Sequence, residues 1–188
     1  MLTVENLPLQ DAKLFKLARH GDARGWFTET FRQSWIEEHL ADKKFIFEFY
    51  SFSAAANTLR GLHAQTAECP QAKLVSVLNG SIQDVLVDAR VNSSTYGQSC
   101  SIILTKDEPA LIYVPRGFYH GFITLEPNTY VGYKVDNYHN ASVECGVDAE
   151  DTTLDIQWQF LPGQSLVISE RDQRHPSWVD AYKFQGTL

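Results

Sequence analysis

The sequence lacks several features that would assign it to common functional classes. Its three cysteines, Cys69, Cys100 and Cys145, are scattered and form no Cys-x-x-Cys pair, so a zinc or dithiol redox motif is not supported. No apolar run approaches the length of a membrane span, and the N-terminus has no signal-peptide pattern. The net charge of −7 argues against nucleic acid or an anionic membrane as the main partner. We therefore expect a cytoplasmic protein that binds neither nucleic acid nor membrane.

The length and composition suit one globular domain. The chain has 188 residues, 44% of them hydrophobic, which allows a sizeable core. The aromatic share of 12% fits β structure or a binding cleft with flat walls. Since no repeat or linker separates two parts, we predict a single domain over residues 1–188. It has an N-terminal strand and helix extension and a less regular C-terminal tail from Gln157.

The hydrophobic pattern is mainly that of β structure. Helical spacing of Phe31, Trp35, Ile36 and Leu40 predicts one short helix over Arg32–Leu40. Short strand-like runs separated by turns predict a β-sandwich or barrel. These runs cover residues 44–52, 59–65, 73–78, 81–87, 97–104, 110–114, 121–125 and 130–138.

Smaller features complete the prediction. The first 19 residues indicate one or two strands near an edge, residues 20–25 a turn, and Trp26–Phe31 a further strand. Asn79-Gly80 lies between two β-rich runs, which is a strong signal for a hairpin.

Two stretches place a basic residue and a histidine in an apolar, strand-like context. The first is Leu59-Arg60-Gly61-Leu62-His63, and the second contains Pro115-x-Gly117-x-x-His120. The second is a cupin-type motif, in which proline fixes φ and glycine permits a tight turn, so that the following histidine is held inward. We predict that His63 and His120 face one cavity and that this cavity accepts an anionic substrate.

The sequence also argues against a catalytic metal. Cupins usually bind a metal through a His-x-His pair, but the corresponding stretch here reads His63-Ala64-Gln65. His63 and His120 alone are a poor ligand set, because a metal site needs three or more good ligands. A histidine without a metal can act as a base or bind an anion.

Several motifs together resemble the metal-independent nucleotide-sugar epimerases of the cupin fold, the dTDP-4-dehydrorhamnose 3,5-epimerase family. The resemblance extends from about Asp22 to about Asp172. The motifs that carry it are Asp22-x-Arg24-Gly25-x-Phe27-x-Glu29, Leu59-Arg60-Gly61-Leu62-His63, Lys73-Leu74-Val75, Asp84-Val85-x-Val87-Asp88-x-Arg90, Pro115-x-Gly117-Phe118-x-His120-Gly121-Phe122 and Tyr133-Lys134.

The resemblance implies a cupin-type jelly-roll sandwich and an epimerase that needs no cofactor. The family's substrate is a nucleoside-diphosphate 4-keto-6-deoxyhexose, whose ketone acidifies the protons on C3 and C5. It implies that His63 is the base, Tyr133 the opposing acid, and Asp172 the carboxylate that orients the imidazole. Lys73 would stabilise the enolate oxygen.

The resemblance also implies binding roles. Arg60 and His120 would contact the diphosphate or the sugar hydroxyls. Arg24, Phe27 and Glu29 match the nucleotide-binding strand, which the family contributes across a dimer interface, so a homodimer with strand exchange is implied. Further substrate contacts are implied for Glu144 and Arg171, the latter at a position where family members carry lysine.

The sequence departs from the family at three positions. The family usually has Gln-x-Asn where this chain reads Glu48-Phe49-Tyr50, and a base-stacking tyrosine where it has His139. We therefore keep Glu48, Tyr50 and His139 as substrate-binding candidates and expect that the nucleotide or sugar differs, for example CDP- or GDP-linked. The remaining alternatives are a single-site epimerase or ketoisomerase, a non-catalytic sugar-binding cupin and a metal-dependent oxygenase-type cupin.

Overall fold

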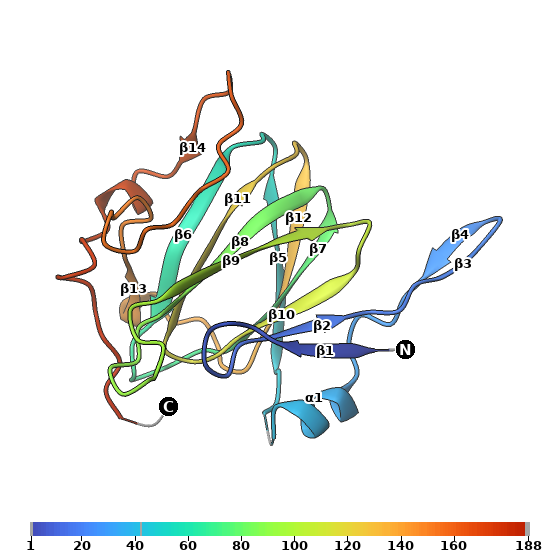
Figure 1. The fold of residues 1–188 in the computed structure, drawn as a ribbon, viewed down its shortest axis with the longest axis horizontal. Helices are drawn as coiled ribbons and strands as arrows, with labels where there is room; N and C mark the ends of the chain where they lie inside the picture. The colour runs from blue at the N-terminus through green and yellow to red at the C-terminus, as the bar shows by residue number, and fades with distance from the viewer. Residues whose placement is uncertain (1, 42, 187–188) are drawn as a thin grey trace.

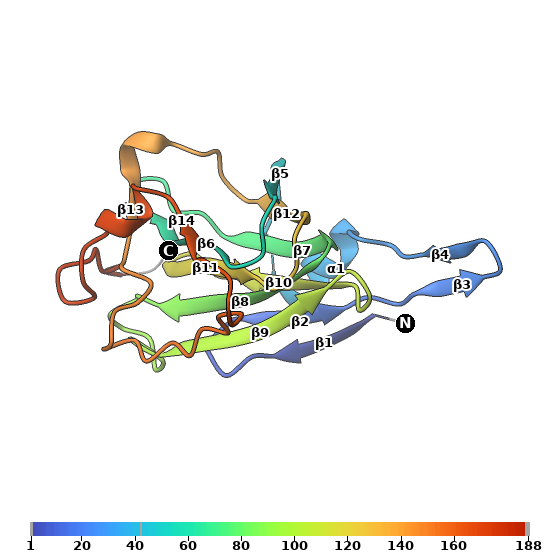
Figure 2. The ribbon, with the colours of Figure 1, turned by 90° about the horizontal axis from the view of Figure 1, so that it is seen from above.

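The computed structural model describes residues 2–41 and 43–186, most of which build two sheets that face each other (Figures 1 and 2). The first sheet consists, in spatial order, of β1 (Thr3–Asn6), β2 (Lys13–Lys16), β10 (Ala110–Val114), β7 (Lys73–Asn79), β12 (Thr129–Val135) and β5 (Phe47–Ser53). The second consists of β13 (Glu144–Gly146), β6 (Thr58–Gln65), β11 (Phe118–Thr124), β8 (Ser81–Asp88) and β9 (Ser99–Thr105), with β14 (Val167–Ile168) also beside β6. All pairs are antiparallel except β14 with β6. The predicted mainly β sandwich is confirmed.

The main core lies between the two sheets. Val75 and Val131 point inward from the first sheet, and Leu86 and Phe122 from the second, and all four are at most 1% exposed. Because side chains alternate along a strand, each strand presents every second residue to this core. The alternation predicted from the sequence therefore determines which side chains can enter the interior.

A second apolar cluster covers the outer face of the second sheet. Tyr119 and Val85 point away from the main core and pack with Trp178 and Phe184 from the C-terminal tail. This explains why β8 is buried at every position, on both faces. The tail has little regular structure, but it is held against the sheet through β14 and the 3₁₀ turn η2 (Asp172–Arg174). A second 3₁₀ turn, η1 (Ala141–Val143), precedes β13.

The outer face of the first sheet is only partly covered. The helix α1 (Gln33–His39) packs Ile36 against Phe15 and Leu111, so the predicted helix is confirmed. No described helix is long and apolar enough to cross a membrane. At the other end of the sheet, β5 is an edge strand, and its outward side chains Tyr50 and Phe52 are exposed.

A hairpin of β3 (His20–Asp22) and β4 (Gly25–Phe27) projects away from the sandwich (Figure 2). The prediction of a turn over residues 20–25 was too broad, because the turn itself is only Ala23-Arg24. The predicted strand over Trp26–Phe31 was also too long, since it ends at Phe27. The strand has only the short β3 as a partner, and beyond it the chain turns back toward α1.

The hairpin predicted at Asn79-Gly80 is wrong. The two residues do form a tight turn, with Gly80 at φ +83°. However, β7 pairs with β10 and β12 in the first sheet, whereas β8 pairs with β11 and β9 in the second. The turn carries the chain from one sheet to the other, a connection that the local sequence signal does not distinguish from a hairpin.

Candidate active site

A cavity of about 650 Å³ opens between the two sheets. Its walls come from β5, β7 and β12 of the first sheet, from β6 and β11 of the second, and from the segment around η2. Nine of the predicted site residues line it, namely Arg60, His63, Lys73, His120, Tyr133, His139, Glu144, Arg171 and Asp172.

The two histidines face this cavity from neighbouring strands. His63 on β6 and His120 on β11 are direct cross-strand partners, so their side chains share one face of the sheet. Gly117 has φ +82°, the left-handed conformation that the turn before β11 requires. The prediction that both histidines line one cavity is confirmed.

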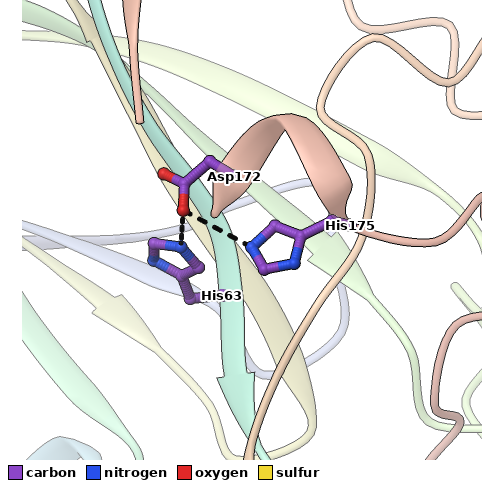
Figure 3. A group of neighbouring side chains, drawn as sticks. All are labelled: His63, Asp172 and His175. Atoms are coloured by element: carbon purple, nitrogen blue, oxygen red, sulfur yellow. Dashed lines mark hydrogen bonds and ion pairs between the residues drawn. The ribbon is translucent and has the colours of Figure 1, made fainter. Parts of the chain in front are cut away.

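His63 forms a hydrogen-bonded pair with Asp172 (Figure 3). Nε2 of the ring lies 2.9 Å from Oδ1 of the carboxylate, while Oδ2 accepts the backbone N–H of Gly61 at 3.1 Å. Burial alone would raise the pKa of Asp172, but the hydrogen bonds from His63 and Gly61 hold it well below its ordinary value. An ionised Asp172 requires the N–H of His63 on Nε2, which leaves Nδ1 as the proton acceptor.

His120 has a carboxylate partner of its own. Its Nε2 lies 2.9 Å from Oδ2 of Asp84, and both side chains are almost completely buried. Burial lowers the pKa of His120, and the nearby Asp84 carboxylate offsets only part of that effect. His120 is therefore a neutral group near pH 7 whose orientation is fixed by Asp84.

Lys73 and Tyr133 enter the cavity from the first sheet, opposite the histidines. Burial lowers the pKa of Lys73 to about 8, although the carboxylates of Glu144 and Asp84 act in the opposite direction. Burial raises the pKa of Tyr133, which keeps its hydroxyl protonated. The cavity thus offers a base from one sheet and a proton donor and a cation from the other.

The remaining charged groups make the cavity locally basic. Arg60 is held by Ser53 Oγ and the Phe52 carbonyl, which accept from its guanidinium. Near the rim, Glu144 pairs with Arg171 at 2.9 Å and with His139 at 3.2 Å. The protein is acidic overall, but an anionic ligand in this cavity would meet Arg60, Arg171 and Lys73.

The structure does not bring Arg24, Phe27 or Glu29 to this cavity. They lie on or just after the β3–β4 hairpin, where Arg24 pairs with Asp22 and Glu29 with Arg32. The side chain of Arg24 is 89% exposed, and Phe27 is 63% exposed. Within one chain these residues are remote from the histidines.

Glu48 and Tyr50 also lie outside the cavity, so their placement in the sugar pocket is wrong for this chain. Residues Phe49 and Ser51 are paired with Tyr133 and Val131 and share their inward face. Because a shift of one residue along a strand reverses the face, Glu48 and Tyr50 point outward. There Glu48 accepts from Lys134 at 2.6 Å and from the Tyr50 hydroxyl at 2.9 Å.

Several residues in or beside the cavity were not predicted as site residues from the sequence. Phe49 and Ser51 could have been found from the alternation of β5, had its register been known. Asp84 was part of a recognised motif, but only the fold pairs it with His120. His175 carries no sequence signal and comes to the site because it follows η2.

One group of donors could hold a metal ion. The ligand atoms of His63, Asp172 and His175 lie within 4.8 Å of one another (Figure 3). The guanidinium of Arg171 is 3.3 Å from Nε2 of His63, and a fixed positive charge at that distance opposes a cation. The donor set alone therefore does not argue for a metal.

Comparison with known proteins gives a consistent result. Residues 6–180 match the family model described as dTDP-4-dehydrorhamnose 3,5-epimerase. The chain is 38% identical to the enzyme of that name from Sinorhizobium fredii, over 92% of this chain and 88% of the relative. It is 34% identical to the Escherichia coli enzyme, over 92% of both chains.

Solved structures agree with this comparison. The epimerase of Bacillus anthracis, determined with TDP and PPi bound, superimposes with a TM-score of 0.88 at 40% identity, covering 94% of this chain and 99% of that one. A 3,5-epimerase of Legionella pneumophila in complex with dTDP-4-keto-L-rhamnose gives a TM-score of 0.92 at 30% identity, covering both chains completely. By sequence and by fold, this chain belongs to the dTDP-4-dehydrorhamnose 3,5-epimerase family, whose members are isomerases.

Proposed function

We propose that the protein epimerises a dTDP-linked 4-keto-6-deoxyhexose at C3 and C5, through an enolate and without a metal, in cytoplasmic deoxysugar biosynthesis. The observation that carries this proposal is the His63–Asp172 pair, which faces a cavity whose opposite wall contains Tyr133 and Lys73. A module that only binds sugar has no need of a base oriented by a buried carboxylate.

The reaction follows from the placement of these groups. Nδ1 of His63 takes the proton from the carbon beside the ketone, and Asp172 stabilises the imidazolium that forms. The electron pair moves into the enolate, whose oxygen is stabilised by the ammonium group of Lys73. Tyr133 then donates a proton to the opposite face of the carbon, which inverts it. The cycle closes when the tyrosinate regains a proton from solvent and the imidazolium of His63 releases one to solvent.

The cavity gives no reason to expect a nucleotide other than thymidine diphosphate. The argument for a different nucleotide or sugar depended on Glu48, Tyr50 and His139. Of these, Glu48 and Tyr50 face outward, and Glu48 is paired with Lys134. Two solved relatives are described with TDP or a dTDP-sugar bound. His139 remains a difference, and at 53% exposure its side chain lies at the rim, where a base would stack.

The protein acts, in this proposal, as a homodimer that exchanges its β3–β4 hairpin. The hairpin has few contacts with its own sandwich and exposes Trp26 and Phe27. The outer face of β5 and β12 exposes further aromatic side chains, Tyr50, Phe52 and Tyr130. Pairing of these faces would bury them and bring Arg24 to the nucleotide end of the partner's cavity.

Proton NMR in deuterated water tests the reaction, with dTDP- and CDP-4-keto-6-deoxyglucose as substrates. We expect the wild type to exchange the protons at C3 and C5 of the dTDP-sugar, and His63→Ala to exchange neither. Exchange at one carbon alone would make the protein a single-site epimerase. Preference for the CDP-sugar, or no exchange, would refute the proposed substrate.

Complementation tests the dimer. We expect His63→Ala and Arg24→Ala each to have little activity at low substrate concentration. A hybrid of the two variants should regain activity, because one of its cavities then combines an intact His63 with an intact Arg24 from the other chain. A monomer in sedimentation analysis, or a hybrid no more active than its parents, would contradict the exchange.

A further inference from the structure

The ring of His175 lies beside the His63–Asp172 pair (Figure 3). Its Nε2 nevertheless has no hydrogen-bond partner in the described chain. This nitrogen is 3.5 Å from Oδ1 of Asp172, the same oxygen that accepts from His63 at 2.9 Å. The ring also meets that of His63 edge-on, with centroids 5.3 Å apart and planes at 82°. A buried polar atom without a partner is uncommon and calls for an explanation.

The absence of a side chain at Gly146 makes room for the ring of His175. Gly146 on β13 is the cross-strand partner of His63. A Cβ atom at Gly146 would overlap the ring of His175, so the imidazole lies directly on the glycine backbone. His175 is therefore enclosed between Gly146 and His63, and its side chain is only 13% exposed.

His175 does not line the substrate cavity, whereas His63 and Asp172 do. The charged groups that face it are His63 on β6, Glu144 on β13, and Arg171 and Asp172 next to its own segment. Burial, together with the positive charge that His63 can carry, lowers the pKa of His175. It is thus a neutral imidazole next to the pair and does not meet the substrate.

We propose that His175 is a positioning residue that holds the His63–Asp172 pair in its reactive orientation, an inference that depends on the proposed epimerase function. Its Nε2 lies 3.5 Å from Oδ1 of Asp172 without forming a hydrogen bond, and its ring packs edge-on against the ring of His63. When His63 accepts the substrate proton, the imidazolium stays against the carboxylate and His175 exchanges no proton. Such fixed placement of a base contributes to rate by orientation rather than by binding.

A double-mutant cycle between His175 and Gly146 tests this role. We expect His175→Ala to lower kcat by about tenfold while KM changes by less than about twofold, because the residue lies outside the cavity. Gly146→Ala should cause a similar loss, since its methyl group displaces the ring. The double variant should lose no more than His175→Ala alone, because the methyl group then occupies the vacated space.

Two further variants serve as controls. His175→Gln keeps an N–H donor and should recover part of kcat, whereas Arg174→Ala, whose side chain is 75% exposed, should behave as the wild type. An unchanged kcat in His175→Ala, an effect on KM alone, or additive losses in the cycle would overturn the inference.

NMR of the imidazole nitrogens provides a readout that needs no substrate. We expect the N–H of His63 to reside on Nε2 in the wild type and to be shared between both nitrogens in His175→Ala. An unchanged tautomer would also overturn the inference. If the wild type turned over no sugar nucleotide, the proposed function would fail, and the tautomer measurement would still decide the role of His175.

Discussion

The ring of Phe49 is stacked on the ring of Tyr133, with centroids 4.7 Å apart and planes 11° apart. The two residues are cross-strand partners on β5 and β12, and both face the cavity. His120 also meets the ring of Tyr133 edge-on, with centroids 6.2 Å apart. Tyr133 is therefore held by contacts with two rings, which suits a group that must deliver a proton in one direction.

Tyr133→Phe should separate the two halves of the reaction. The stack survives the change, but the proton donor is lost, so we expect epimerisation to fall by roughly 10²–10⁴-fold. His63 can still remove a proton and return a deuteron to the same face. Deuterium uptake in heavy water should therefore persist without inversion, as followed by NMR. Equal losses of uptake and inversion would show that Tyr133 is not the opposing acid.

The β5 residues that point into the cavity, rather than those that point outward, should recognise the substrate. The double variant Glu48→Gln, Tyr50→Asn should keep the nucleotide preference of the wild type, because both side chains point away from the cavity. The matched variant Phe49→Gln, Ser51→Asn changes the inward pair and should alter kcat/KM for the dTDP-sugar by about tenfold or more. The comparison uses dTDP- and CDP-sugars, with sedimentation to verify that each variant keeps the wild-type assembly. A changed preference in the outward pair alone would reverse this assignment.

The residues of β5, β6 and β11 show which features of the site can be predicted from the sequence and which cannot. The residue types of Leu59–His63 and Pro115–His120 indicated strands, a turn and two inward histidines, because the periodicity and the glycine and proline positions are local signals. The side of the sheet to which each β5 side chain points is not encoded locally, since it depends on which residue of β12 pairs with Phe49. The prediction of a hairpin at Asn79-Gly80 was wrong for the same reason, because strand pairing is not determined by the local sequence. The pairing of His120 with Asp84 and the position of His175 beside Asp172 arise only when distant strands and the tail pack together.

Lys73 should produce the alkaline limb of the pH–rate profile. Its pKa is lowered to about 8, so the ammonium group that stabilises the enolate is lost as the pH rises through that value. We expect kcat/KM to decline above about pH 8. Tyr133 does not account for this limb, because burial raises its pKa.

Substitutions at Lys73 should identify the source of that limb. Lys73→Arg keeps a charge that is not lost and should remove the decline, with a lower plateau because the guanidinium is larger. Lys73→Met should reduce kcat/KM by roughly 10²–10³-fold at every pH. An alkaline limb that persisted unchanged in Lys73→Arg would exclude this lysine as its origin.

The buried histidines should make the fold less stable under mildly acidic conditions. Burial lowers the pKa of both His120 and His175 in the folded protein, whereas a histidine in the unfolded chain titrates near 6.5. Below about pH 6.5 the unfolded chain therefore binds more protons than the folded one. The free energy of unfolding then decreases as the pH decreases. Asp172, whose pKa is also lowered, contributes only at more acidic pH, near the ordinary titration of a carboxyl group.

Urea unfolding at pH 7.5, 6.5 and 5.5, at a fixed protein concentration, measures this dependence. The wild type should lose stability steadily across the series, and His175→Asn should lose less, because it no longer has that ionisable group. Each unit by which a pKa is displaced corresponds to about 1.4 kcal/mol, so the difference in slope is measurable. A wild type whose stability stayed level or rose toward pH 5.5 would show that these histidines do not remain neutral in the folded protein.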